Sequence, residues 1–354
     1  MAERVVIAAG GTGGHIFPAQ ACADEFIRWG WRVSFVGVGR ELERRVFPSR
    51  GDYHVVKARP LKGGGPRQKV LSLVAMLLAV KAALGLLRSL NPACVLGMGG
   101  YSSGPVILAA ALLRVPRAIH EQNTVPGLAN RLSAPFAQRI FVSFEETLKA
   151  FPASKTLLTG NPVREEVVQK AQRTGRGDTF TLFVMGGSQG ARAINQAMAE
   201  ALPHLRGSIE VIHQTGKDDP LWVQEAYRRH GVKATVFPFT EDVGSCYGRA
   251  HLVVSRAGAL TLAELAVVGR ASILIPYPFA ADDHQRRNAE AFCRRGAALM
   301  IPQEDLTGEH LARRIKELMA DEGLRRKMEE RALQLGRPEA AREVVERSIE
   351  LCEG

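Results

Sequence analysis

Apolar, β-branched runs alternate with helical stretches along the whole chain. In the first half these runs lie at residues 5–10, 33–39, 53–58, 94–100, 117–120 and 139–144; in the second half they lie at 180–187, 210–216, 234–239, 252–258, 272–278 and 298–302. Short apolar runs that are each followed by a helix are typical of buried parallel strands. The pattern therefore predicts an α/β protein with two βα-repeating domains.

Both halves begin in the same way, with a strand, a glycine turn and a helix, which predicts a duplicated Rossmann-like plan. Between them, the segment TGNPVREEV (159–167) contains Pro162, which prevents a helix from crossing the junction. We therefore expect a hinge here, domains at 1–160 and 165–336, and a ligand cleft beside the hinge.

The end of the chain is predicted to be helical. Beyond about residue 308 the sequence is heavily charged, and the tripeptide GRP (336–338) interrupts it. We expect a last helix within residues 338–354. It can cover the second domain or pack back on the first, and the sequence leaves both placements open.

The composition is that of an ordinary folded protein. The chain has 354 residues, of which 46% are hydrophobic and 23% charged, so it is too apolar for a disordered protein and long enough for two cores. Its five cysteines are far apart, which argues against a disulfide framework or a zinc site and fits a reducing cytoplasm. The first residues run directly into a strand pattern, so we expect no signal peptide.

Positive charge is concentrated in the first half. Residues 1–160 contain 20 Lys and Arg against 9 Asp and Glu, whereas residues 161–354 contain 27 of each, so the first half carries the whole net charge of +11. An excess confined to one half suggests an anionic partner: a phosphorylated substrate, a nucleic acid or an acidic membrane surface.

One apolar segment, residues 67–92, allows two interpretations. Its densest run, Val70 to Val80, is about half of the ~20 residues that a membrane-spanning helix needs, so we expect no transmembrane helix. The segment can be a crossover helix buried against the sheet. It can also contact a membrane surface, because basic residues flank or interrupt the run (Arg67, Lys69, Lys81 and Arg88). Both interpretations can hold on different faces.

Three glycine-rich turns follow predicted strands: GGTGGH (10–15), GMGGYSSGP (97–105) and GGSQGA (186–191). In the first and third, backbone N–H groups and the start of a helix can bind phosphate or another anion, and Ser188 adds a hydroxyl. The first turn fits the dinucleotide fingerprint only loosely, which disfavours NAD. His15 lies at the edge of this turn, where we expect it to act as a general base or to orient one.

Polar side chains follow other predicted strands. HEQN (120–123) combines an imidazole, an acid and two amides, and amides suit sugar hydroxyls and N-acetyl groups because they donate and accept hydrogen bonds. Glu264, in the helix after SRAG (255–258), can accept hydrogen bonds from the two hydroxyls of a ribose. Gln285 and Asn288 add two amides. The sequence has no DxD pair, so we expect no metal ion.

In this order, GGTGGH, MGGYSSGP, HEQN, GNPVR, GGSQGA and RAGALTLAE resemble the motifs of the MurG family of N-acetylglucosaminyltransferases over the whole chain. The resemblance implies a GT-B fold, in which two Rossmann-like parallel-sheet domains face each other across a cleft. It implies inverting transfer of N-acetylglucosamine (GlcNAc) from UDP-GlcNAc to the C4 hydroxyl of N-acetylmuramic acid (MurNAc). The acceptor would be undecaprenyl-pyrophosphoryl-MurNAc-pentapeptide (lipid I) and the product lipid II, for peptidoglycan synthesis.

The resemblance also implies where the protein acts and which residues bind substrate. It implies peripheral attachment to the cytoplasmic face of the cell membrane, an anionic membrane surface as partner, no nucleic acid and no cofactor. The first domain would hold the acceptor and the membrane, and the second UDP-GlcNAc. By motif position, the substrate-binding residues would be Thr12, Gly13, Gly14, Asn123, Arg164, Ser188, Thr240, Ala259, Leu260, Thr261, Leu262, Ala263, Glu264 and Gln285.

An inverting transfer needs a base for the acceptor proton and positive groups for the departing diphosphate. His15 is the expected base or its orienting partner, and Glu121 is the rival. Arg164 and the helix after Ser188 would stabilise the leaving UDP. Two alternatives stay open: a GT-B relative, such as a UDP-GlcNAc 2-epimerase or a transferase with another acceptor, and a nucleotide-regulated membrane-binding module without catalysis.

Overall fold

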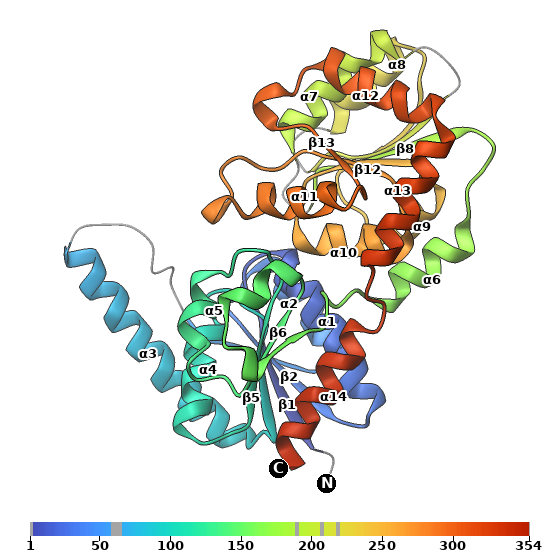
Figure 1. Ribbon diagram of the computed structural model, residues 1–354. Coiled ribbons are helices and arrows are strands. Elements are labelled where there is room, and N and C mark those ends of the chain that lie inside the picture. Colours follow the sequence, from blue (N-terminus) through green and yellow to red (C-terminus); the bar gives the residue numbers. More distant parts are fainter. Residues whose placement is uncertain (1–2, 58–65, 188–190, 206–208, 217–219, 354) are drawn as a thin grey trace. The chain divides into compact units, whose positions relative to one another are not determined.

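The computed structural model describes residues 3–57, 66–187, 191–205, 209–216 and 220–353 and divides into two compact units. Unit 1 comprises Met1–Arg164 and Pro338–Gly354, and unit 2 comprises Glu165–Arg337. The chain therefore leaves unit 1 after Arg164, at the end of the GNPVR segment, and returns to it within GRP (Figure 1).

In the described part of unit 1, seven strands form one parallel sheet in the order β3-β2-β1-β4-β5-β6-β7. Their bounds are β1 Arg4–Ala8, β2 Arg32–Gly37, β3 Asp52–Val55, β4 Cys94–Gly97, β5 Arg117–Glu121, β6 Arg139–Val142 and β7 Thr156–Leu158. The main helices are α1 Gly13–Arg28, α2 Glu41–Val46, α3 Pro66–Leu90, α4 Ser103–Leu112, α5 Leu128–Ser133 and α14 Ala340–Glu353. The first six strands coincide with the predicted runs, and β7 was not predicted.

Helices cover both faces of this sheet because successive strand residues point to opposite sides. Val5 and Leu96 face α1 and α14, whose Val344 is buried in the same core. Val6 faces the other way, into a core with α3 and α4 that includes Leu87. The C-terminal helix α14 therefore packs on unit 1, which is one of the two placements that the sequence left open.

Helix α3 has two stretches with different surroundings. Ala83 and Leu87, in its C-terminal part, are buried against the sheet and α4, as expected for a crossover helix. Nearer its N-terminus, Leu71, Val74 and Leu77 are exposed by 68%, 47% and 61%, and this end extends away from the sheet in Figure 1. The burial expected for a crossover helix is thus confirmed for the C-terminal part of α3, and the N-terminal part has exposed apolar side chains. Within the described ranges, no helix is long and apolar enough to cross a bilayer.

The described part of unit 2 holds six parallel strands in the order β10-β9-β8-β11-β12-β13. Their bounds are β8 Phe180–Met185, β9 Ile209–Gln214, β10 Lys233–Phe237, β11 Leu252–Ser255, β12 Ser272–Leu274 and β13 Leu299–Met300, and all six lie within predicted runs or overlap them. The main helices are α6 Glu165–Thr174, α7 Arg192–Ala201, α8 Pro220–Arg229, α9 Val243–Arg249, α10 Ala259–Val268, α11 His284–Arg294, α12 Gly308–Ala320 and α13 Glu322–Leu335.

In each unit the strand order reverses beside the first strand. Strand β1 lies between β2 and β4, and β8 lies between β9 and β11. Ligands of open α/β sheets bind beyond the carboxyl ends of the strands at such a reversal. The glycine turns after β1 and β4, the start of the turn after β8 at Gly186 and Gly187, and the SRAG turn after β11 lie at these positions. The predicted pair of Rossmann-like parallel-sheet domains is confirmed.

Candidate active site

The first glycine turn of unit 1 ends at the start of a helix. Gly11 has a φ of +111°, a conformation that favours glycine, and Thr12 comes next in an extended conformation as the N-cap of α1. The N–H groups in the first turn of a helix have no partner within the helix, so those of Gly13 and Gly14 can face a ligand. The turn therefore has the geometry of an anion site.

The turns after β1 and β4 touch each other. A Cβ atom on Gly100 would lie 1.9 Å from the carbonyl oxygen of Gly10, so the two backbones are in direct contact. Gly99 faces the side chain of His15: a Cβ atom there would lie 3.0 Å from the imidazole Nδ1 and 3.6 Å from Oε1 of Gln122. The second turn thus makes room for the His15 ring beside Gln122, a relation that the sequence motifs did not reveal.

The histidine of HEQN has a structural role. His120 is fully buried, and its Nε2 donates a hydrogen bond to the carbonyl oxygen of Gly160 at 2.9 Å. Burial lowers the pKa of this imidazole to about 4, so the ring is neutral at pH 7. His120 therefore ties β5 to the segment where the chain leaves unit 1.

The acid of HEQN is saturated with hydrogen bonds. Glu121 is buried, and its Oε1 accepts from the backbone N and Nδ2 of Asn123 at 2.9 and 3.3 Å. Its Oε2 accepts from the N of Gly127 and the Nδ2 of Asn130 at 3.0 and 2.8 Å. The carboxylate therefore holds the loop that carries Asn123.

Arg164 is the last of the predicted residues in unit 1. Its guanidinium lies over the ring of Phe17, with 4.4 Å between Cζ and the ring centroid. Phe17 lies in the first turns of α1, two residues after His15. The structure therefore brings the predicted base and the predicted arginine to the same end of α1.

In unit 2 the predicted ribose ligand lies on α10. Glu264 is only 5% exposed, and its Oε2 accepts a hydrogen bond from the hydroxyl of Tyr247 at 3.0 Å. The other predicted residues of this helix (Ala259, Leu260, Thr261, Leu262 and Ala263) form its first turns, directly after the N-cap Gly258. Tyr247, which orients the carboxylate, was not among the predicted residues because it lies on a different helix, α9.

The remaining predicted residues of unit 2 that the structure describes, Thr240 and Gln285, lie beyond the strands. Oγ1 of Thr240 accepts from the N of Asp242, and Oε1 of Gln285 accepts from the N of Tyr277, each at 3.0 Å. Ser188 lies outside the described residues. Nε2 of Gln214 donates to the carbonyl oxygens of Gly187 at 3.1 Å and Pro238 at 2.7 Å, so this side chain links the GGSQGA turn to the loop before Thr240.

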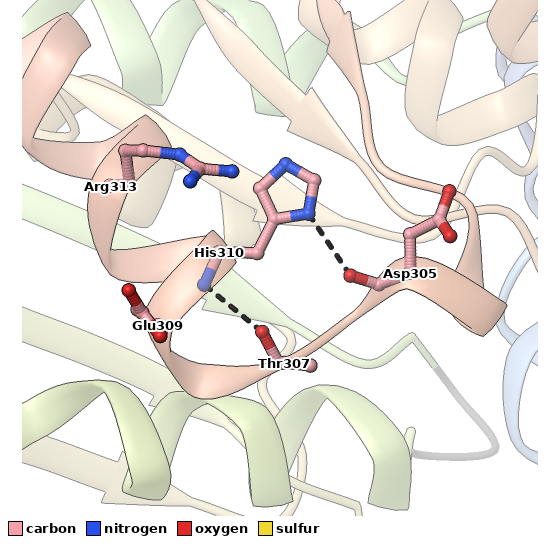
Figure 2. Close-up of a pocket in the computed structure, with 5 residues that line it drawn as sticks. All are labelled: Asp305, Thr307, Glu309, His310 and Arg313. Atoms are coloured by element: carbon pink, nitrogen blue, oxygen red, sulfur yellow. Dashed lines mark hydrogen bonds between the residues drawn. The ribbon is translucent and has the colours of Figure 1, made fainter.

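A shallow hollow of 390 Å³ lies elsewhere on unit 2, at the start of α12 (Figure 2). Its lining residues are Asp305, Thr307, Glu309, His310 and Arg313. Nδ1 of His310 lies 3.0 Å from the carbonyl oxygen of Asp305, and its backbone N donates to Oγ1 of Thr307 at 3.1 Å. The bond to Thr307 is the N-cap of α12, and none of the predicted site residues that the structure describes lines the hollow.

Comparison with known proteins places this architecture in a family. Residues 5–142 match the glycosyltransferase family 28 N-terminal domain, and residues 181–344 match the C-terminal domain of that family. The chain is 43% identical over 350 residues to the UDP-N-acetylglucosamine--N-acetylmuramyl-(pentapeptide) pyrophosphoryl-undecaprenol N-acetylglucosamine transferase of Citrifermentans bemidjiense, with 97% of this chain and 98% of the relative aligned. The transferase of the same name from Myxococcus xanthus is 44% identical, with 98% and 93% aligned.

The chain belongs to the MurG family of glycosyltransferases. The solved structure of Acinetobacter baumannii MurG superimposes with a TM-score of 0.80 at 32% identity and covers 98% of this chain and 99% of that one. A UDP-N-acetylglucosamine 2-epimerase structure superimposes with a TM-score of 0.67 at 14% identity over 98% of this chain and 95% of that one, which shows a shared fold alone. The predicted MurG family and GT-B fold are thus confirmed.

Proposed function

We propose that the chain transfers GlcNAc from UDP-GlcNAc to the MurNAc sugar of undecaprenyl-pyrophosphoryl-MurNAc-pentapeptide. The observation that carries this proposal is the near full-length identity of 43% and 44% to transferases named for this reaction. The distribution of groups supports it, because the candidate base lies in unit 1 and the candidate ribose ligand in unit 2.

In this mechanism His15 is the general base. Its imidazole accepts the proton of the MurNAc C4 hydroxyl while that oxygen attacks the anomeric carbon on the face opposite to UDP, so the configuration inverts. Nδ1 of His15 is buried against Gly99, so we assign Nε2 as the atom that accepts the proton of the C4 hydroxyl. Glu121 is a poorer base because its carboxylate already accepts four N–H groups. We assign Glu121 the positioning of Asn123.

The donor contacts are assigned to both units. Glu264 is assigned to the ribose hydroxyls, and the start of α10, the helix that carries Glu264, is assigned to the same nucleotide. Thr240 lies beside the uracil, and Gln285 and Asn123 contact the sugar of the donor. As the glycosidic bond breaks, negative charge grows on UDP, and positive groups placed in advance stabilise that charge. Arg164, Ser188 and the N-terminus of α7 are assigned this role, and the turn at Thr12, Gly13 and Gly14 is assigned to diphosphate oxygens.

The exposed stretch of α3 is proposed to contact the membrane that contains the lipid acceptor. Leu71, Val74, Leu77 and Leu78 present apolar surface to solvent, and Lys81 is exposed one turn further on. Apolar insertion and attraction of basic residues to anionic headgroups act together in such contacts, and each basic residue near the surface contributes about 1 kcal/mol. This surface would place the enzyme peripherally on the cytoplasmic face.

One assay tests the reaction. The protein is incubated with labelled UDP-GlcNAc and a short-chain, water-soluble analogue of the lipid acceptor, and the products are separated. A labelled disaccharide linked to the lipid analogue is the expected product. Formation of UDP-N-acetylmannosamine without the acceptor would instead identify an epimerase. Absence of turnover, with UDP binding intact, would leave a nucleotide-binding module.

A further inference from the structure

The most completely bonded carboxylate in the described part of unit 1 belongs to none of the sequence motifs. Glu43, on the short helix α2, is 0% exposed. Its Oε2 accepts hydrogen bonds from the backbone N of Val38 (2.9 Å), Gly39 (2.8 Å) and Arg40 (3.1 Å) and from the hydroxyl of Tyr53 (2.7 Å). Burial of a carboxylate is unfavourable unless donors replace its water, and these four donors supply that replacement.

The second oxygen of Glu43 reaches the first glycine turn. Its Oε1 accepts a hydrogen bond from the N of Gly11 at 3.0 Å, across 32 residues of sequence. Nη1 of Arg40 donates to the carbonyl oxygen of Gly11 at 3.4 Å. The N–H and the carbonyl oxygen of Gly11 are therefore both hydrogen-bonded to side chains at the start of α2. Gly10 also lies against the carboxylate, since a Cβ atom there would be 3.3 Å from Oε1. The orientation of the Gly11 peptide is thus set from α2.

The orientation of the Gly11 peptide determines where α1 begins. Thr12 is the N-cap of α1, and its carbonyl oxygen accepts from the N of His15 at 3.0 Å. A rotation of the Gly11 peptide would therefore move the first turn of α1 together with His15. Because Glu43 takes the N–H of Gly11, the donors left for a ligand are those further along the turn.

We propose that Glu43 is a positioning residue that sets the first turn of α1, and with it His15, for the transfer reaction. This inference rests on the proposed function of the turn and of His15. Glu43 touches no reacting atom and acts through Gly11. A residue that only braced the fold would change stability without selectively changing the catalytic step.

The test compares Glu43→Gln with Tyr53→Phe. In Glu43→Gln the amide oxygen can still face the four donors around Oε2, but the amide N–H₂ then faces the N–H of Gly11, and that bond is lost. Tyr53→Phe removes one donor from Oε2 and leaves Gly11 untouched, which makes it the matched control. Glu43→Asp, whose carboxylate is too short to reach both groups of donors, serves as the second variant.

We expect Glu43→Gln to lower kcat by about 10- to 100-fold, since a misplacement of about 1 Å can cost 10²-fold. Its affinity for UDP, measured by calorimetry, should fall by less than kcat falls, because the turn that Glu43 sets supplies only part of the contacts assigned to the diphosphate. Amide hydrogen exchange of a peptide covering residues 10–16 should become faster than in the wild type, and Tyr53→Phe should leave both kcat and this exchange within about twofold. If Glu43→Gln does not fold, Glu43→Asp should show the same selective loss.

A folded Glu43→Gln or Glu43→Asp with wild-type kcat and wild-type exchange would overturn the proposal. So would an equal loss of kcat in Tyr53→Phe, or failure of both Glu43 variants to fold, because Glu43 would then act only as a brace. If the wild type transfers no sugar, the proposed function is wrong. The exchange measurement would still report whether Glu43 holds the turn.

Discussion

Substitution of Glu264 distinguishes its proposed contact with the substrate from its hydrogen bond to Tyr247 within the protein. The carboxylate accepts a hydrogen bond from the buried hydroxyl of Tyr247 and keeps acceptor capacity for the ribose hydroxyls of UDP. Glu264→Ala removes both contacts. Glu264→Gln keeps an oxygen for Tyr247 but loses the charge and half of the acceptor capacity.

The expected losses in UDP binding and in folding stability follow from these hydrogen bonds. Loss of the ribose hydrogen bonds should cost roughly 1 to 3 kcal/mol of UDP binding, which is about a 5- to 150-fold rise in Kd. Glu264→Ala also removes the carboxylate that accepts from the buried hydroxyl of Tyr247, at a further cost of about 1 to 3 kcal/mol in folding stability. Glu264→Gln should weaken UDP binding without most of that loss in stability.

Calorimetry with UDP and denaturant unfolding measure the two effects separately. Tyr247→Phe is the control, because it deletes the internal bond and leaves the carboxylate in place. UDP affinity of Tyr247→Phe should remain within a few-fold of the wild type. If Glu264→Ala and Tyr247→Phe weaken UDP binding equally, or if Glu264→Ala binds UDP normally, Glu264 does not contact the ribose and the assignment is wrong.

Three further predictions concern unit 1. His15→Ala should lower kcat by about 10²- to 10⁴-fold, the usual contribution of a general base, with UDP affinity nearly unchanged in calorimetry; loss of UDP binding would contradict the role as base. Burial lowers the pKa of His120 from a usual 6.5 to about 4. As the pH falls from 6.5 to 4, this imidazole is protonated in the unfolded chain but not in the folded one, so the free energy of unfolding should fall by up to about 3 kcal/mol. Urea unfolding of the wild type and of His120→Asn should show this pH slope in the wild type only. Leu77→Ser combined with Lys81→Glu should reduce co-sedimentation with anionic vesicles and turnover of a long-chain acceptor, while turnover of a water-soluble analogue stays normal; equal loss on both acceptors would exclude a membrane role for α3.

The strands were predictable from sequence because a buried parallel strand needs an unbroken apolar run. Strand β7, Thr156–Leu158, was missed because its only two apolar residues lie between polar neighbours, whereas the equally short β12 is part of a longer apolar run. The surroundings of α3 also escaped prediction, and the reason is different. Leu77 and Leu87 are chemically identical, yet Leu77 is 61% exposed and Leu87 is 1% exposed. Only the end of the sheet and the position of α4 decide where the covered stretch stops.

The residues of the candidate site were likewise predictable only in part. Glycine turns and HEQN could be found because their residue types and their positions after strands are local properties. Sequence could not separate His15 from Glu121, since both are ionisable residues beside a strand end. The four hydrogen bonds to Glu121 are the ground on which we propose His15 rather than Glu121 as the base. Glu43 could not be found at all, because its link to Gly11 spans 32 residues and forms only when α2 packs beside the first turn.

The excess of basic residues in the first half of the chain indicates what kind of anionic partner this half has. Both proposed substrates are anionic, because UDP-GlcNAc and the lipid acceptor each carry a diphosphate. If substrate charge alone set the number of basic residues, the half to which most nucleotide contacts are assigned would also be basic, yet residues 161–354 contain 27 basic and 27 acidic residues. The excess in residues 1–160 therefore exceeds what a diphosphate requires and fits a surface with many charges. An anionic membrane is such a surface, and its attraction is screened by salt over about 8 Å at physiological ionic strength. Added salt should therefore weaken vesicle binding much more steeply than it weakens UDP binding.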